Sequence, residues 1–297
     1  MSVFLFPGQG SQKAGTAKLF YDISPAARAV FDRMAASLTE DVMQVLFEGS
    51  QEDINHTRNA QPVLLCTEIA ITAHLASLGI QPALCAGHSL GEIAAFTVAG
   101  AIELEDAVLF ILERARLMSE EVPEGGMAAV IGMEPKEIEL LLCAGTQVAN
   151  YNGPLQTIIS GSSHSLSVTI QALKDHGARR VLPLQVSGPF HSEYMKPAAV
   201  ALERYLDSMN IFKPEVPVLS SVSGTYEDDP VRIRSLLAQQ LYSPVRWTEV
   251  MDQLEKRKAV EVGPGNALAG LAKRASCAPL VFPANTPESC ERLSSVL

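Results

Sequence analysis

Long hydrophobic runs are absent from this sequence of 297 residues, although 47% of its residues are hydrophobic. Because a membrane-spanning helix needs about 20 consecutive apolar residues, we expect no such segment. The first seven residues, Met-Ser-Val-Phe-Leu-Phe-Pro, lack the basic region of a secretory signal peptide and are too short for one. We therefore expect them to form a buried first strand.

Basic residues are fewer than acidic residues in this chain. The chain has 23 Lys and Arg against 33 Asp and Glu, which gives a formal net charge of −10. A chain this acidic is not attracted to the phosphate backbone of a nucleic acid. We therefore exclude nonspecific nucleic-acid binding, while a length near 300 residues allows one large domain or two unequal ones.

The cysteines are few, odd in number and scattered, with no spacing typical of a metal site. They are Cys66, Cys85, Cys143, Cys277 and Cys290. Free thiols are typical of a reducing compartment. We therefore expect a cytoplasmic protein without disulfides or a bound metal.

The most informative segment is a G-x-S-x-G pentapeptide centred on Ser89, which follows an apolar run at 84–86 and precedes a helix-compatible stretch. A strand, a sharp turn and a helix in this order expose a serine hydroxyl above the helix N-terminus, where an oxyanion is stabilised. Glycine-rich turns of this kind are also common without any catalytic role. The serine is therefore a candidate nucleophile that needs support from other residues.

A serine nucleophile needs a base, and the sequence has six histidines, none of them after His191. This gap excludes the usual α/β-hydrolase order, in which the histidine comes late in the chain. His88 adjoins the serine, so the turn directs its side chain elsewhere. His191 lies in a Gly-Pro-Phe-His-Ser loop between two regions of different pattern, and such loops often carry site residues. We predict His191 as the base, oriented by a backbone carbonyl.

The hydrophobic pattern changes after Gly126 and changes back near Gly188. Between these points the order β-α-β-β-α-β is typical of a ferredoxin-like unit. We predict a small ferredoxin-like domain over 126–187, inserted into a larger α/β domain formed by 1–125 and 188–297.

Arg114 occupies an unusual position on the helix predicted over 103–121. It falls on the apolar stripe, three residues after Ile111 and four before Met118, whereas Arg116 is placed as a solvated side chain would be. A guanidinium on a stripe that faces the core needs a carboxylate or several carbonyls. A structural ion pair and a side chain that reaches back to the surface are the other interpretations.

Four motifs in this order resemble one family. They are Phe-Pro-Gly-Gln-Gly-Ser-Gln at 6–12, Gly-His-Ser-Leu-Gly-Glu at 87–92, Phe-His-Ser at 190–192 and Gly-Pro-Gly at 263–265. The chain resembles the malonyl-CoA:acyl carrier protein transacylases and the acyltransferase domains of polyketide and fatty acid synthases, from position 6 to about 274. The resemblance implies an α/β fold in which an α/β-hydrolase-like large domain carries the inserted ferredoxin-like domain.

The resemblance implies roles for five residues. Ser89 would accept the acyl group, and His191 would act as general base and acid. The backbone N–H groups of Gln9 and Leu90 would form the oxyanion hole. The carbonyl of Gln240 would hold the histidine.

It also implies a substrate. Arg114 matches the arginine that pairs with the malonyl carboxylate, and Phe190 matches the malonyl-selective form of the histidine loop. Two positions depart from the family pattern: Asn266 stands where a lysine or another residue is found, and Ile93 stands where an aromatic is frequent. Neither is expected to touch the chemistry.

The function implied is transfer of malonyl from malonyl-CoA, through an ester on Ser89, to the phosphopantetheine thiol of acyl carrier protein, which supplies extender units for fatty acid synthesis. We expect a monomer with no metal or cofactor. Loading of a polyketide synthase, a malonate decarboxylase subunit and an acyl-thioester hydrolase are alternatives with the same serine chemistry. A noncatalytic module that docks carrier proteins is an alternative of another class.

The carrier protein is acidic, so an acidic enzyme needs a local basic patch to bind it. The resemblance directs attention to two basic pairs, Arg179-Arg180 and Lys273-Arg274. We expect both pairs to flank the cleft between the domains. Two solvated surface pairs without a partner are the alternative.

Overall fold

The structure is a computed structural model that describes residues 2–120, 122–275 and 279–297. Its larger part is built on a six-stranded sheet with the order β10-β9-β1-β2-β7-β8, parallel except for the pairing of β7 with β8. The strands are β1 (Ser2–Phe6), β2 (Pro82–Gly87), β7 (Val218–Leu219), β8 (Tyr226–Glu227), β9 (Lys258–Val262) and β10 (Leu280–Ala284).

Strand β1 explains why this sheet lies inside the molecule. All five of its residues are buried, as expected for a parallel strand covered on both faces. Alternate residues enter different cores: Phe4 and Phe6 join the cluster on one face, while Val3 and Leu5 join the cluster on the other. The predicted α/β class is therefore confirmed.

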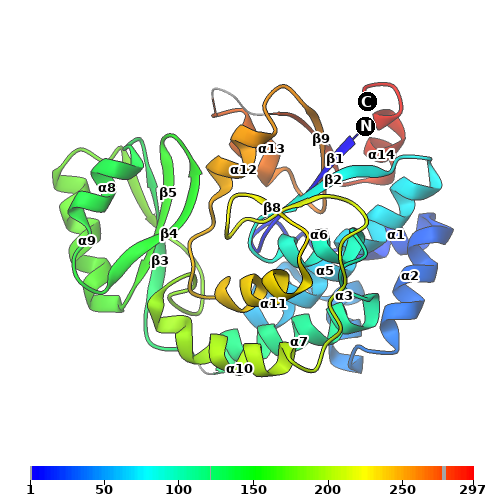
Figure 1. The fold of residues 1–297 in the computed structure, drawn as a ribbon, viewed down its shortest axis with the longest axis horizontal. Helices are drawn as coiled ribbons and strands as arrows, with labels where there is room; N and C mark the ends of the chain where they lie inside the picture. Colours follow the sequence, from blue (N-terminus) through cyan, green and yellow to red (C-terminus); the bar gives the residue numbers. More distant parts are fainter. Residues whose placement is uncertain (1, 121, 276–278) are drawn as a thin grey trace.

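Helices cover both faces of the sheet (Figure 1). The longest is α5 (Thr57–Ser77), whose buried side chains surround it, so it runs through the core. Pro62 lies inside this helix, five residues after its first residue. The other helices of this part are α1 (Thr16–Ile23), α2 (Pro25–Ala35), α3 (Glu40–Glu48), α4 (Gln51–Asn55), α6 (Gly91–Val98), α7 (Leu104–Glu120), α10 (Lys196–Leu206), α11 (Pro230–Gln239), α12 (Trp247–Gln253), α13 (Ala267–Ala272) and α14 (Pro287–Leu293), with a 3₁₀ turn, η1, at Glu193–Met195.

The smaller part, at the left of Figure 1, has its own antiparallel sheet with the order β4-β5-β3-β6. Its elements are β3 (Gly126–Ile131), α8 (Pro135–Leu141), β4 (Thr146–Gly153), β5 (Gln156–Gly161), α9 (Ser163–Asp175) and β6 (Arg180–Pro183). This is the ferredoxin-like arrangement that the sequence predicted. The boundaries proposed at 125/126 and 187/188 stay a prediction.

Backbone hydrogen bonds of the edge strand β4 connect the smaller part to the larger one. Val245 donates its N–H to the Ala149 carbonyl at 2.8 Å, and Tyr151 donates to the Val245 carbonyl at 2.9 Å. The hydroxyl of Thr248 adds a bond to the Tyr151 carbonyl at 3.0 Å. Strand β4 is therefore held by backbone hydrogen bonds beside the segment that leads into α12.

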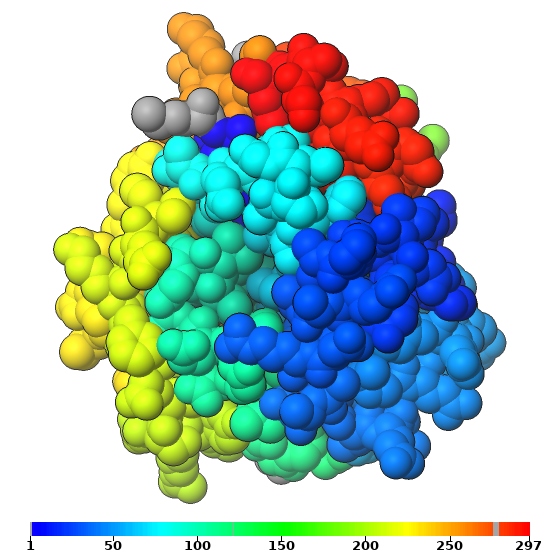
Figure 2. Space-filling view, turned by 90° about the vertical axis from the view of Figure 1, so that its right-hand side faces the viewer, coloured from blue at the N-terminus to red at the C-terminus, as the bar shows by residue number. Residues whose placement is uncertain are grey.

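The two ends of the chain lie side by side on the face turned away from the small domain. Figure 2 shows the amino-terminal helices in blue next to the carboxyl-terminal segment in red. Some elements were not predicted from the sequence. They are the helices over 16–23, 40–48, 51–55, 247–253 and 287–293 and the short strand at 226–227. Within the described ranges, no helix combines the length and apolar character needed to cross a bilayer.

Candidate active site

Ser89 sits at the sharp turn between β2 and α6. The two glycines of the pentapeptide are required by close packing: a Cβ on Gly87 would lie 2.0 Å from the Gly91 carbonyl carbon, and a Cβ on Gly91 would lie 2.1 Å from the Phe6 carbonyl oxygen. Ser89 itself has φ 52°, in the left-handed region that side chains rarely adopt. The turn is therefore the strained strand-to-helix elbow that the sequence pattern predicted.

His191 reaches Ser89 from the junction of the two domains. Its Nε2 lies 2.8 Å from the Ser89 Oγ. Its Nδ1 lies 3.1 Å from the backbone carbonyl oxygen of Ser243. A carbonyl at Nδ1 requires a proton there, so Nε2 is the nitrogen free to accept the serine proton.

The partner of Nδ1 corrects one sequence-based assignment. The resemblance assigned this role to the carbonyl of Gln240, whereas the hydrogen bond goes to Ser243, three residues later. The Gln240 backbone remains a further acceptor that, with Ser243, raises the pKa of His191. The difference arises because the chain turns after α11, which brings both carbonyls to the same side of the imidazole. The side chain of Gln240 points elsewhere, toward Arg114 and Ser89.

Burial holds His191 in its neutral form. The residue is 5% exposed. Desolvation, followed by the positive charge of Arg114 and by His88, lowers the pKa of His191 to about 3. The imidazole is therefore unprotonated, and able to accept a proton, throughout the neutral range.

The pair opens into a cleft of about 1100 Å³ between the domains. Gln9, Leu90, Arg114 and Phe190 also line it, so the predicted site residues other than Gln240 and the docking pairs meet in one cavity. Among the hydrogen bonds of the described residues, none has the backbone N–H of Gln9 or Leu90 as its donor. Leu90 is the N-cap of α6, where the helix dipole favours negative charge.

Arg114 lies on the core-facing stripe of α7, as predicted, and is 1% exposed. Its Nη1 donates to the Gln61 Oε1 at 2.5 Å and its Nη2 to the Gln240 Oε1 at 2.9 Å. Burial lowers the pKa of Arg114 to about 10, against the opposing effect of Glu92, so the guanidinium remains charged at neutral pH. Arg116 instead forms surface ion pairs with Glu113 and Glu120.

The sequence did not single out the polar residues around Arg114. Gln61 and Glu92 are both buried, at 0% and 1% exposure. The position of Glu92 held a signal that could have found it, because it ends the Gly-His-Ser-Leu-Gly-Glu motif. Gln61 follows the mostly polar run Thr-Arg-Asn-Ala at 57–60, so nothing in the local pattern marks it. His88 is directed away from the serine, as predicted, and its Nε2 lies 2.8 Å from the Asn152 Oδ1.

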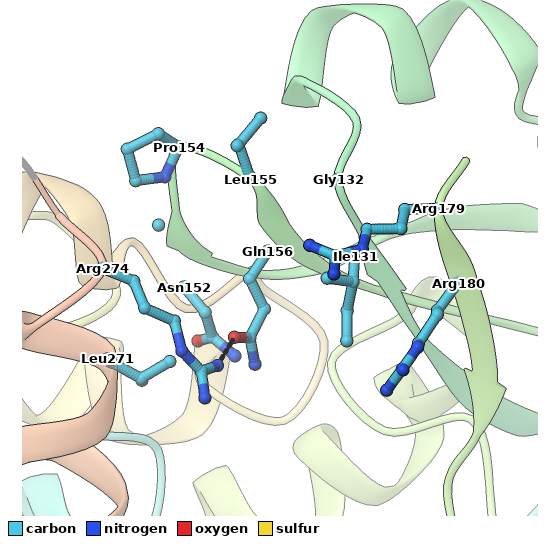
Figure 3. A pocket seen from close by; sticks show the side chains of 11 residues that line it. Ile131, Gly132, Asn152, Pro154, Leu155, Gln156, Arg179, Arg180, Leu271 and Arg274 are labelled. Carbon is cyan, nitrogen blue, oxygen red and sulfur yellow. Dashed lines mark hydrogen bonds between the residues drawn. The ribbon is translucent and has the colours of Figure 1, made fainter. Parts of the chain in front are cut away.

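Three of the four residues predicted for docking gather at a second, separate pocket. Arg179, Arg180 and Arg274 line a hollow of about 370 Å³ between the small domain and α13 (Figure 3). Arg274 donates to the Gln156 Oε1 at 2.7 Å. Lys273 is exposed but does not line this pocket.

The described thiols are free, at Cys66, Cys85, Cys143 and Cys290, while Cys277 lies outside the described residues. Within the part of the chain that the structure covers, no three His, Cys, Asp or Glu side chains are grouped as a metal site would need.

Comparison with known proteins agrees with this geometry. Residues 3–275 match the family model described as acyl transferase domain. The malonyl CoA-acyl carrier protein transacylase of Bacillus subtilis is 41% identical over 97% of this chain and 94% of its own length. The transacylase structure from Coxiella burnetii superposes with a TM-score of 0.94 at 35% identity, covering 100% of this chain and 97% of that one.

A further solved structure is a malonyl-transacylase in complex with a type II polyketide synthase acyl-carrier protein. It has a TM-score of 0.94 at 33% identity and covers 99% of both chains. The family match spans most of the sequence and includes the serine elbow, the histidine loop and the buried arginine. The chain therefore belongs to the acyl transferase family.

Proposed function

We propose that this protein transfers malonyl groups from malonyl-CoA to the phosphopantetheine thiol of an acyl carrier protein, supplying extender units for fatty acid synthesis. The observation that carries the proposal is the hydrogen bond of 2.8 Å between Ser89 and His191 in a cleft that also contains Arg114. The relatives from Bacillus subtilis and Escherichia coli carry the name of this activity.

In the first half-reaction, His191 removes the proton from the Ser89 hydroxyl through Nε2. The oxygen attacks the thioester carbonyl, and the N–H groups of Gln9 and Leu90 stabilise the oxyanion. Removal of one such donor commonly lowers a rate by about 10²–10³-fold. The carbon–sulfur bond then breaks, His191 returns the proton to the departing CoA thiolate, and malonyl remains as an ester on Ser89.

In the second half-reaction the carrier thiol takes the place of CoA. His191 accepts its proton, the sulfur attacks the ester, and Ser89 regains its proton as it leaves. No step calls for a metal or a bound cofactor. We propose that the enzyme acts as a monomer and that Arg179, Arg180, Lys273 and Arg274 contribute to carrier binding near the pocket of Figure 3.

Arg114 selects malonyl in this proposal. Its guanidinium has five N–H donors, two of which bind Gln61 and Gln240, so others remain for a carboxylate. A thioester hydrolase has no need of this charge, which disfavours that alternative. Loading of a polyketide synthase uses the same chemistry, and the complex with a polyketide carrier protein keeps it as the second candidate.

The test is an intact-mass measurement after mixing with malonyl-CoA without carrier protein. We expect one malonyl group on the peptide that contains Ser89, and none in Ser89→Ala. An adduct that persists in Ser89→Ala would exclude the covalent mechanism. Rapid return to the unmodified mass, with free malonate formed, would favour the hydrolase.

A further inference from the structure

The side-chain amide of Gln240 joins three parts of the active site. Its Nε2 donates to the Glu92 Oε2 at 2.7 Å and to the Ser89 carbonyl oxygen at 2.9 Å. Its Oε1 accepts from the Arg114 Nη2 at 2.9 Å. Because a carbonyl only accepts and a guanidinium only donates, the amide satisfies all three partners in one orientation alone.

Glu92 is itself held firmly beside the elbow. It lies in the first turn of α6 and is 1% exposed. Its Oε1 accepts the backbone N–H of Ser221 at 3.0 Å, and its Oε2 accepts the Ser221 hydroxyl at 2.9 Å. With Gln240, these bonds satisfy a buried carboxylate that would otherwise be costly. The acceptor that fixes the amide therefore cannot rotate away.

Arg114 meets neutral oxygens where a buried arginine usually meets a carboxylate. Its two hydrogen bonds go to the amides of Gln61 and Gln240, and no ion pair of Arg114 occurs within the described ranges. Its Nε is buried and has no partner there. Glu92, the carboxylate that acts on its charge, is on the far side of Gln240.

We propose that Glu92 and Gln240 are positioning residues that determine acyl-group specificity. Glu92 fixes the amide of Gln240, and the amide presents its oxygen, rather than its nitrogen, to Arg114. The guanidinium is then held in place without being neutralised, so a substrate carboxylate supplies its ion pair. The inference rests on the proposed malonyl transfer. It adds a role for the side chain of Gln240, of which only the carbonyl was assigned one, and a role for Glu92, which had none.

The same bonds connect substrate recognition to the nucleophile. Gln240 holds the carbonyl of Ser89 and the guanidinium of Arg114 with one amide group. A shift of Arg114 is therefore transmitted to the elbow through a side chain of fixed geometry. Positions of reacting groups that are wrong by about 1 Å can lower rates by about 10²-fold.

The decisive variant is Gln240→Glu, which keeps the size of the side chain but places a carboxylate beside Arg114. This carboxylate would occupy the ion pair reserved for the substrate. We expect the KM for malonyl-CoA in Ser89 acylation to rise at least about tenfold. Acetyl-CoA, which lacks the carboxylate, should lose much less, so the malonyl-to-acetyl ratio of kcat/KM should fall by about the same factor.

A second variant, Glu92→Gln, removes the carboxylate that fixes the side-chain amide of Gln240. It should also lower the malonyl-to-acetyl ratio of kcat/KM. The matched control is Gln239→Glu, the same substitution one residue earlier. The Gln239 side chain bonds Ser235 at 2.7 Å and is not part of the site, so its ratio should remain that of the wild type. Thermal unfolding of each variant shows whether it is folded.

The outcomes separate the two proposals. If the wild type forms no malonyl ester on Ser89, the proposed function fails. If it forms the ester but Gln240→Glu and Glu92→Gln both keep the wild-type ratio, the specificity role is wrong. Equal losses toward malonyl-CoA and acetyl-CoA, in folded variants, would also overturn it. If Gln240→Glu does not fold, the malonyl-to-acetyl ratio of Glu92→Gln alone tests the specificity role.

Discussion

Ser89 and His191 are hydrogen-bonded at 2.8 Å across 102 positions of sequence, and both have a positive φ, 52° and 56°. Among the described non-glycine residues, Lys256 alone shares this feature. Such a conformation costs on the order of 1 kcal/mol or more per residue, and it persists where the surrounding structure enforces it. The strain lies at the two residues assigned to proton transfer and nucleophilic attack.

His191→Ala should slow the burst of CoA release on mixing with malonyl-CoA by about 100-fold or more, the usual loss when a general base is removed. Stopped-flow detection of the free thiol measures this rate. His176→Ala is the control, because its imidazole bonds the carbonyl of its own helix at Ala172. A burst near the wild-type rate would move the base to another residue, with His88 the first to test.

The pH dependence of the same burst follows from burial. Desolvation and the nearby Arg114 lower the pKa of His191 to about 3. The neutral, proton-accepting form then dominates at every pH above that value. We expect no loss of acylation rate between about pH 8 and 5.5, whereas an unperturbed imidazole would titrate near pH 6.5. An inflection near pH 6.5 in the folded enzyme would contradict this environment for His191.

Arg114→Ala should reduce malonyl transfer far more than acetyl transfer. Removal of one partner of a buried charge pair commonly costs about 3–5 kcal/mol, which corresponds to a ratio change of about 100-fold or more. Competition between malonyl-CoA and acetyl-CoA, read by mass spectrometry of the ester, gives the ratio. Arg116→Ala, two positions along the same helix, should leave it unchanged. An unchanged ratio in Arg114→Ala would make the arginine structural.

The motifs singled out the candidate nucleophile, base and arginine because each is marked by a local pattern that physical chemistry constrains. Ser89 lies between two glycines that no larger residue can replace, and Arg114 interrupts an apolar stripe. The network of buried hydrogen bonds around Arg114 was not predicted. Glu92, Gln61 and Gln240 come from three helices or their ends, and their contact depends on tertiary packing that no single helix pattern encodes.

The same reason explains the correction at His191. The resemblance pointed to Gln240 for the carbonyl, but which carbonyl lies nearer depends on how the chain turns after α11. The types of the longer helices and strands were predicted from the period of their hydrophobic residues. Short elements such as α4, α12 and β8 were missed because they have seven residues or fewer, which gives too little periodic signal.

The Glu68 carboxyl should make stability fall as the pH rises. It is fully buried on α5, and neither of its oxygens has a hydrogen-bond partner in the described structure. Desolvation, followed by the charge of Glu261, raises the pKa of Glu68 well above its usual value. The folded protein therefore keeps this proton at a pH where the unfolded chain has lost it. The resulting stability is present below the unfolded pKa of about 4.3 and is lost as the pH rises toward the folded value.

Glu68→Gln keeps the shape and cannot ionise. We expect its melting temperature to exceed that of the wild type increasingly as the pH rises from about 5 to 9. Differential scanning calorimetry across this range measures the difference. Glu48→Gln, at the exposed end of α3, is the control and should track the wild type. A constant offset between Glu68→Gln and the wild type would show that Glu68 is not protonated in the fold.

We expect an acidic carrier protein, of the same charge sign as this chain, so we predict that its binding depends on a local basic surface. Arg179, Arg180 and Arg274 gather at one pocket, although Arg274 is far from the other two in the sequence (Figure 3). Surface charges are screened beyond a Debye length of ~8 Å at physiological salt, so these three guanidinium groups outweigh the net charge of −10 only at close range.

Charge reversal of Arg180 and Arg274 to Glu should raise the apparent KM for carrier protein by about tenfold and weaken the dependence of transfer on salt. Acylation of Ser89 by malonyl-CoA should change much less, because the pocket is separate from the cleft that holds the serine. Steady-state transfer at several salt concentrations and the single-turnover burst measure the two half-reactions separately.

The matched control reverses Lys18 and Arg33, whose side chains are exposed and form surface pairs with Asp22 and Glu105. These residues lie on α1 and α2, at the opposite end of the molecule from the small domain (Figure 1). The control changes the net charge by the same amount, so a general repulsion would raise the KM equally in both variants. Equal effects, or a loss confined to acylation, would place the docking surface elsewhere.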